Sequence, residues 1–164
     1  MEAHLERCKW LLLIGLTVLL LGTLVYILDR PPEQAPVLSD LSLFESAPAV
    51  FGSLGHSFPT FAHVFAFCLL TAALLGNARK NAAIICLGWF YVDAAFELGQ
   101  TQTVAESLRP FIPQWFEHLP ILNQAGSFFG NGTFDVIDLI SIALGAVTAY
   151  FVIRRMPLEE NSHA

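Results

Sequence analysis

A group of acidic and amide side chains lies inside a strongly apolar stretch of the chain. Asp93, Glu97 and Gln100 are spaced four and then three residues apart, and this spacing places them on one face of a helix. A charged side chain at the centre of a membrane helix costs about 2.5–3.5 kcal/mol, so such a residue normally has a partner, a proton or a function. We therefore expect this face to contribute to a polar site.

Three further ionisable residues fall in neighbouring apolar segments. His63 lies near the start of one segment, and Asp135 and Asp138 are three residues apart at the start of another. At a rise of 1.5 Å per residue, His63 and Asp93 come out about 10 Å from the expected outer helix ends, and Glu97 and Asp138 roughly 5 Å. The sequence therefore predicts that these six residues, here called the polar cluster, share one pocket open to the outer face.

The polar cluster suggests two kinds of chemistry. Glu97 as a general acid or base, with His63 as its proton partner and Asp135 and Asp138 orienting them, would suit acid–base catalysis. Because four carboxylates exceed what one histidine can neutralise, a shared proton or a cation is also expected among them. These side chains suit zinc or manganese, but no compact motif such as HExxH is present, so no metal is assigned and the cofactor stays undetermined.

A purely structural role for the same residues is the alternative. Asp93 would pair with His63, and Glu97 with Gln100 or Asp138, simply to fix how the helices pack. Asp135 would then stabilise the N-terminus of its helix, where acidic residues are favoured. The sequence leaves both interpretations open.

Long apolar segments must position these side chains. The chain has 164 residues, of which 55% are hydrophobic and only 13% are charged, and this composition favours a membrane protein over a soluble domain. Stretches of about 20 apolar residues can cross a hydrocarbon core of about 30 Å. We predict an all-α, membrane-embedded four-helix bundle that forms a single transmembrane domain over residues 1–164. Its spans are expected at about 10–28, 58–75, 82–100 and 134–153.

The basic residues indicate how the spans are oriented. Cytoplasmic loops carry an excess of Lys and Arg, which places both termini in the cytoplasm. Six of the eight basic residues fall on that side, namely Arg7, Lys9, Arg79, Lys80, Arg154 and Arg155. The connection 101–133 is then an outer loop, and its aromatic residues predict an interfacial helical segment. His56 and His118 are expected in solvent, and nothing in the charge pattern suggests nucleic-acid binding.

Three sequence motifs resemble the VanZ-like family of small bacterial membrane proteins. They are FAHVFAF, FELGQ and FDVIDLISIALGA, and the resemblance covers residues 52–153. It matches His63 to the family histidine, Glu97 and Gln100 to its E-x-x-Q pair, and Asp135, Asp138 and Gly145 to its final motif. Two departures stand out: the family arginine before Phe134 is absent, and Ile142 replaces an asparagine.

The resemblance implies a multi-pass protein of the bacterial cytoplasmic (inner) membrane, with Gly145 serving helix packing. It also implies a role in the cell envelope, because the founding member of the family is associated with resistance to the glycopeptide teicoplanin. The two departures put in question any activity that needs the missing arginine.

Three functions are consistent with these expectations. The first is a binding protein whose outward pocket takes a lipid headgroup, a lipid-linked envelope intermediate or an amphipathic drug. The second is an intramembrane enzyme that acts on a lipid or polyprenyl substrate through Glu97 and His63. The third is a small proton-linked transporter. Membrane lipids are partners in each case, and the oligomeric state stays open because Gly15 and Gly22 are too far apart for a GxxxG motif.

Overall fold

The computed structural model describes residues 2–32, 36–44, 49–75, 78–119, 122–124, 126, 129 and 132–156. Within these ranges every regular element is a helix. Four of the helices are long and apolar enough to cross a membrane, which confirms the prediction of an all-helical chain with four such segments. They are α1 (Glu2–Asp29), α2 (Leu54–Leu74), α3 (Ala78–Gly99) and α6 (Val136–Arg155).

The helix boundaries differ from the predicted ones at the ends that concern the polar cluster. The second helix begins four residues earlier than expected, at Leu54, and so contains Pro59 in its interior; proline is tolerated there because neighbouring membrane helices can satisfy the freed backbone group. α3 ends at Gly99, which leaves Gln100 just outside it. Asp135 is the residue that caps α6 rather than part of its first turn.

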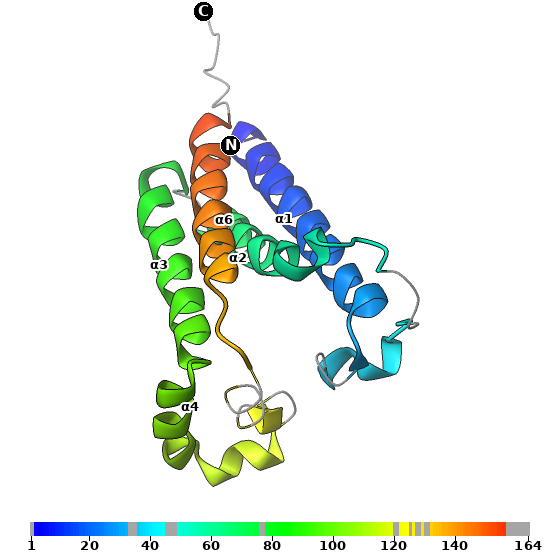
Figure 1. Ribbon diagram of the computed structural model, residues 1–164. Coiled ribbons are helices and arrows are strands. Elements are labelled where there is room, and N and C mark those ends of the chain that lie inside the picture. The colour runs from blue at the N-terminus through cyan, green and yellow to red at the C-terminus, as the bar shows by residue number, and fades with distance from the viewer. Residues whose placement is uncertain are drawn as a thin grey trace, which may run out of the picture.

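α2 and α6 form the centre of the molecule. α1 packs against α2, while α3 packs against both α2 and α6, so α1 and α3 lie on opposite sides of the central pair (Figure 1). The contacts between the helices enclose a core that includes the fully buried residues Leu11, Leu69, Ile142 and Ile153.

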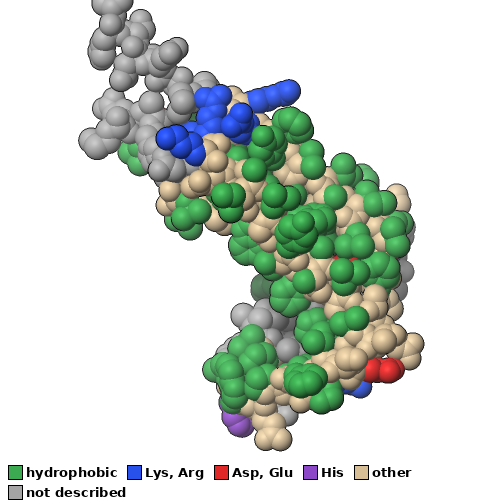
Figure 2. Space-filling model, turned by 90° about the vertical axis from the view of Figure 1, so that its left-hand side faces the viewer, with side chains coloured by type: hydrophobic (Ala, Val, Ile, Leu, Met, Phe, Trp, Pro, Cys, Tyr) green, Lys and Arg blue, Asp and Glu red, His purple; other side chains and the backbone are tan. Residues whose placement is uncertain are grey.

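Apolar side chains also cover the outside of the helices. Leu20 is 68% exposed and Ile84 is 73% exposed, and Figure 2 shows hydrophobic side chains over most of one face. A water-soluble domain of this size rarely leaves such a continuous apolar surface uncovered. An apolar surface of this kind is favourable where it faces the hydrocarbon core of a membrane.

Small residues set the contact between α1 and α2. A Cβ atom placed on Gly22 would lie 3.0 Å from the Cβ of Ala62, and one on Gly15 would lie 3.3 Å from the carbonyl oxygen of Ala66. Such residues allow membrane helices to approach closely. Gly15 and Gly22 are seven residues apart, which is two helical turns. This spacing does not fit GxxxG, but it places both glycines on the face of α1 that meets α2 in the same chain.

Polar contacts tie the helices together at both ends. At one end, Arg7 of α1 donates from Nη2 to the carbonyl oxygen of Ile153 in α6, over 2.9 Å, so the start of α1 and the end of α6 lie at the same end (Figure 1). At the other end, the Asp29 carboxylate accepts from the backbone N–H groups of Val50 and Phe51, each over 2.8 Å. The latter contacts join the end of α1 to the segment that leads into α2.

The connection between α3 and α6 contains the helical segment that the sequence predicts. α4 (Gln102–Leu108) follows α3 almost directly, and 3₁₀ helices continue it at Arg109–Phe111, Gln114–His118 and Leu122–Gln124. Residues 120, 121, 125, 127, 128, 130 and 131 of this connection lie outside the described ranges.

Candidate functional site

His63 and Asp93 form a polar pair between α2 and α3. The imidazole Nδ1 lies 3.2 Å from Oδ1 of Asp93, and the His63 side chain is 46% exposed whereas that of Asp93 is 11% exposed. The centroid of the Phe67 ring lies 4.4 Å from that of the imidazole. The Trp89 ring lies on Phe67 at a tilt, with the two centroids 4.7 Å apart. The partner that the structure shows for His63 is therefore Asp93, as in the structural alternative.

Glu97 contacts the start of the last helix. It is only 7% exposed, and its Oε1 accepts a hydrogen bond from the backbone N–H of Asp135 over 2.7 Å. Asp135 in turn accepts from the N–H of Ile137 through its own Oδ1, over 2.8 Å. Because the first N–H groups of a helix have no partner within it, both carboxylates satisfy donors at the N-terminal end of α6.

Asp138 is held by a residue that the sequence analysis did not consider. The Thr60 hydroxyl of α2 donates to Asp138 Oδ1 over 3.0 Å. Asp138 also lies within electrostatic range of Asp135, Arg30 and His56, and Arg30 is fixed there by a 2.8 Å bond from its Nη2 to the carbonyl oxygen of His56. Positive charge near the carboxylates thus comes from Arg30, in the connection between α1 and α2.

The structure places five of the six residues of the polar cluster in two groups, and Gln100 lines the cleft described below. His63 and Asp93 form one pair, while Glu97, Asp135 and Asp138 gather at the start of α6 within electrostatic range of one another. Gly145 lies further along α6, where an added Cβ would come within 2.8 Å of the carbonyl oxygen of Phe61 in α2. Its place is therefore at the closest approach between α2 and α6.

Beyond the end of α3, a cleft of about 600 Å³ opens between α4 and the segment leading into α6. We call it the outer cleft. Gln100 lies one turn after Glu97, and Phe134 directly precedes Asp135, so the Glu97–Asp135 hydrogen bond joins two walls of the outer cleft. Its lining residues are Gln100, Thr101, Gln102, Ala105, Glu106, Arg109, Phe129, Gly132, Thr133 and Phe134.

The outer cleft combines both signs of charge with aromatic surface. Glu106 accepts a hydrogen bond from the Gln102 amide over 3.0 Å, and Arg109 follows three residues later on the same wall. Phe129 forms an apolar part of the lining and stacks on Phe96 with ring centroids 6.1 Å apart. The Phe129 ring fits there because Gly99 has no side chain, since a Cβ at that position would lie 2.7 Å from it.

The sequence analysis identified Gln100 but missed the other polar residues of the outer cleft. The signal was present, because Gln102, Glu106 and Arg109 repeat the spacing of four and then three residues seen in Asp93, Glu97 and Gln100. This spacing lies outside the apolar segments, where polar residues are common and do not by themselves indicate a site. The segments on either side of α4 determine that these side chains border a cleft.

The donor atoms of the outer cleft favour hydrogen bonding over metal binding. One carboxylate, one guanidinium and amide groups can bind a polar headgroup that carries opposite charges. In the part of the chain that the structure describes, no three His, Cys, Asp or Glu side chains converge as metal ligands would.

Comparisons with known proteins give no family for the chain. No family model, no curated protein and no solved structure matches it. The site is therefore interpreted from its own geometry.

Proposed function

We propose that this chain is a multi-pass membrane protein that binds an amphipathic molecule in the outer cleft. The ligand is a lipid, or a lipid-linked envelope intermediate or drug of similar build, with a headgroup that carries both phosphate and amine. The observation that supports the proposal most directly is the outer cleft itself, because Glu106 and Arg109 border a space of about 600 Å³ directly beyond the membrane-spanning part of α3.

The two charges suit the two ends of such a headgroup. A guanidinium binds phosphate oxygens through charge-assisted hydrogen bonds, and the carboxylate of Glu106 can accept from an ammonium group. Gln102 holds that carboxylate in place through its amide, over 3.0 Å. Phe129 and Phe134 then provide apolar surface for the first part of an acyl chain.

The location that we propose is the bacterial cytoplasmic membrane, with the outer cleft on the extracytoplasmic side. The support is the basic end of the bundle, since Arg7 contacts the last turn of α6, where Arg154 and Arg155 follow. Such an excess of positive charge marks the cytoplasmic side. The resemblance to the VanZ-like family, with a role in the envelope and in glycopeptide resistance, belongs to the same proposal.

The test is lipid retention by the purified full-length protein. Native mass spectrometry from mixed micelles would compare phosphatidylethanolamine with diacylglycerol of the same acyl chains, which lacks the phosphate and the amine. We expect phosphatidylethanolamine to be retained in preference. We expect R109Q to weaken that retention by about tenfold or more, the effect of losing a charge-assisted hydrogen bond of roughly 1.5–3 kcal/mol.

The matched control is R154Q, which removes the same charge at the other end of the molecule. It should retain phosphatidylethanolamine as the unaltered protein does. Equal retention of the two lipids by the unaltered protein, or equal loss in R109Q and R154Q, would contradict binding in the outer cleft.

A further inference from the structure

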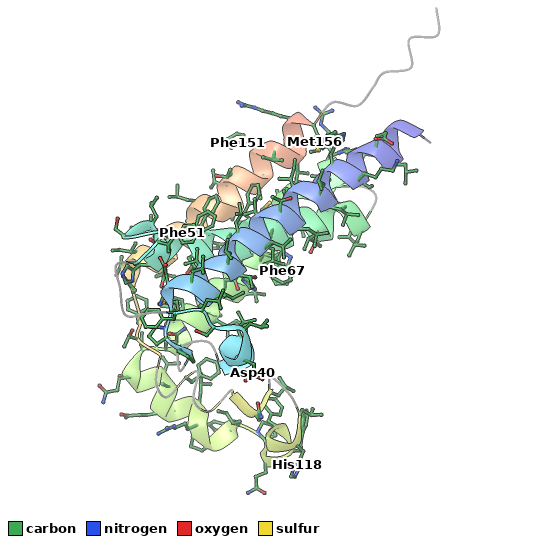
Figure 3. The ribbon with its side chains drawn as sticks, turned by 90° about the vertical axis from the view of Figure 1, so that its right-hand side faces the viewer. Asp40, Phe51, Phe67, His118, Phe151 and Met156 are labelled. Atoms are coloured by element: carbon green, nitrogen blue, oxygen red, sulfur yellow. The ribbon has the colours of Figure 1, made fainter. Side chains whose placement is uncertain are left out.

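A second hollow lies on α6, at the end of the molecule opposite the outer cleft. It is an open depression of about 550 Å³, lined by Thr148, Phe151, Val152, Arg155 and Met156. These residues cover the last two turns of α6, and Figure 3 shows Phe151 and Met156 near the end of that helix. The volume falls within the range of roughly 300–1,000 Å³ that is usual for small-molecule sites.

The hollow has one charged residue at its rim and an apolar wall below it. The guanidinium carbon of Arg155 lies 5.6 Å from the centroid of the Phe151 ring, which is within cation–π range and holds the charge against the helix. Thr148 lies seven residues before Arg155, about 10 Å deeper along the helix axis. This order of charge, aromatic ring and aliphatic surface matches a phosphate followed by an acyl chain.

The charge at this end of the bundle points to an anionic occupant. Figure 2 shows Lys and Arg side chains gathered there. Among the described residues at this end, only Lys9 has a carboxylate partner, Glu6 at 2.6 Å, and the buried Nε of Arg7 has no hydrogen-bond partner in those residues. Basic pockets at the ends of membrane helices bind the headgroups of anionic lipids.

We infer that the hollow on α6 binds one anionic phospholipid. Its phosphate contacts Arg155, and the upper part of one acyl chain packs against Phe151 and Val152. This site shares no residue with the outer cleft, so it shares with the proposed function only the membrane location and does not depend on ligand binding in the outer cleft. It requires only that this end of the bundle lies at a membrane surface.

Native mass spectrometry of the full-length protein tests the inference. The protein would be held in mixed micelles that contain equal amounts of phosphatidylglycerol and phosphatidylcholine with the same acyl chains. We expect the unaltered protein to retain phosphatidylglycerol in preference. In R155Q the preference should fall by about fivefold, the effect expected for one arginine near the membrane surface.

R154Q is the matched control, because Arg154 is the neighbouring arginine, lies over the ring of Tyr150 and does not line the hollow. It should keep the preference. A second variant, T148W, obstructs the hollow at an exposed position without changing any charge, and it should lower retention even if R155Q fails to fold. The inference is overturned if R154Q and R155Q lose the preference equally, or if the unaltered protein retains both lipids alike.

Discussion

Glu97 shows how a single buried carboxylate can have a structural partner that its sequence context does not reveal. Its spacing from Asp93 and Gln100 predicts a shared helix face, but α3 ends before Gln100, and the partner of Glu97 is the backbone N–H of Asp135, 38 residues further along the chain. The local spacing around Glu97 encodes no bond to a main-chain group 38 residues away. The sequence analysis anticipated the His63–Asp93 pair and the place of Asp135 at the helix start, but not the partner of Glu97.

This contact predicts different effects for two substitutions of Glu97. E97A leaves the part-buried backbone N–H of Asp135 without its acceptor, and should lower the free energy of unfolding by about 1 kcal/mol. E97Q keeps an amide oxygen that can accept the same hydrogen bond, and should lower the free energy of unfolding by clearly less than E97A does. Unfolding in detergent followed by far-ultraviolet circular dichroism measures both.

E106A serves as the control, because Glu106 is exposed and bonds only to the Gln102 amide among the described residues. Exposed substitutions of this kind usually change stability by no more than about 0.5 kcal/mol. If E97A were as stable as E106A, the hydrogen bond from Asp135 to Glu97 would not contribute to the free energy of unfolding.

At the scale of elements, glycines determine how close the helices come. Gly145 lies on the face of α6 that meets α2, whereas Gly88 in α3 has open space around it. The sequence predicted four apolar helices because hydrophobic run length reports directly on membrane crossing. It did not predict which faces of α1 and α2 meet, because Gly15 and Gly22 look alike in sequence to a glycine such as Gly88, where an added Cβ would have nothing within 4 Å.

G145A and G88A therefore form a matched pair. In G145A the new Cβ would lie 2.8 Å from the carbonyl oxygen of Phe61, so α2 and α6 must separate at a cost of about 1–3 kcal/mol. G88A adds the same methyl group where nothing lies within 4 Å, and should not destabilise the protein. The same detergent unfolding measurement compares them, and equal stability of the two variants would contradict the close contact between α2 and α6.

The whole molecule has two unlike ends. One carries the start of α1, the end of α6 and most of the basic residues, and the other carries the outer cleft, α4 and the start of α6 (Figure 1 and Figure 2). The separation of charge along the sequence predicted this polarity, because alternate connections between spans emerge at opposite ends. The outer cleft was not predicted, since it depends on how the connection after α3 folds back over Gly99.

Thiol labelling tests the proposed orientation. In a variant whose own cysteines are replaced by serine, a new cysteine at exposed Ser107 of α4 should react with a membrane-impermeant maleimide added to intact cells. A cysteine at exposed Lys80 should react only after lysis, because the basic end is expected in the cytoplasm. Labelling of the Lys80 position alone in intact cells would mean that the orientation is reversed.

The hydrogen bond between Arg7 and Ile153 bears on how the chain is made. Its two residues are 146 positions apart, and during synthesis the N-terminal part of a protein emerges first. The guanidinium of Arg7 must therefore wait for its carbonyl acceptor until α6 has been made. A product that stops before α6 could assemble its early helices but would keep a cation without this acceptor, a defect by which proteases could distinguish it from a chain that contains α6.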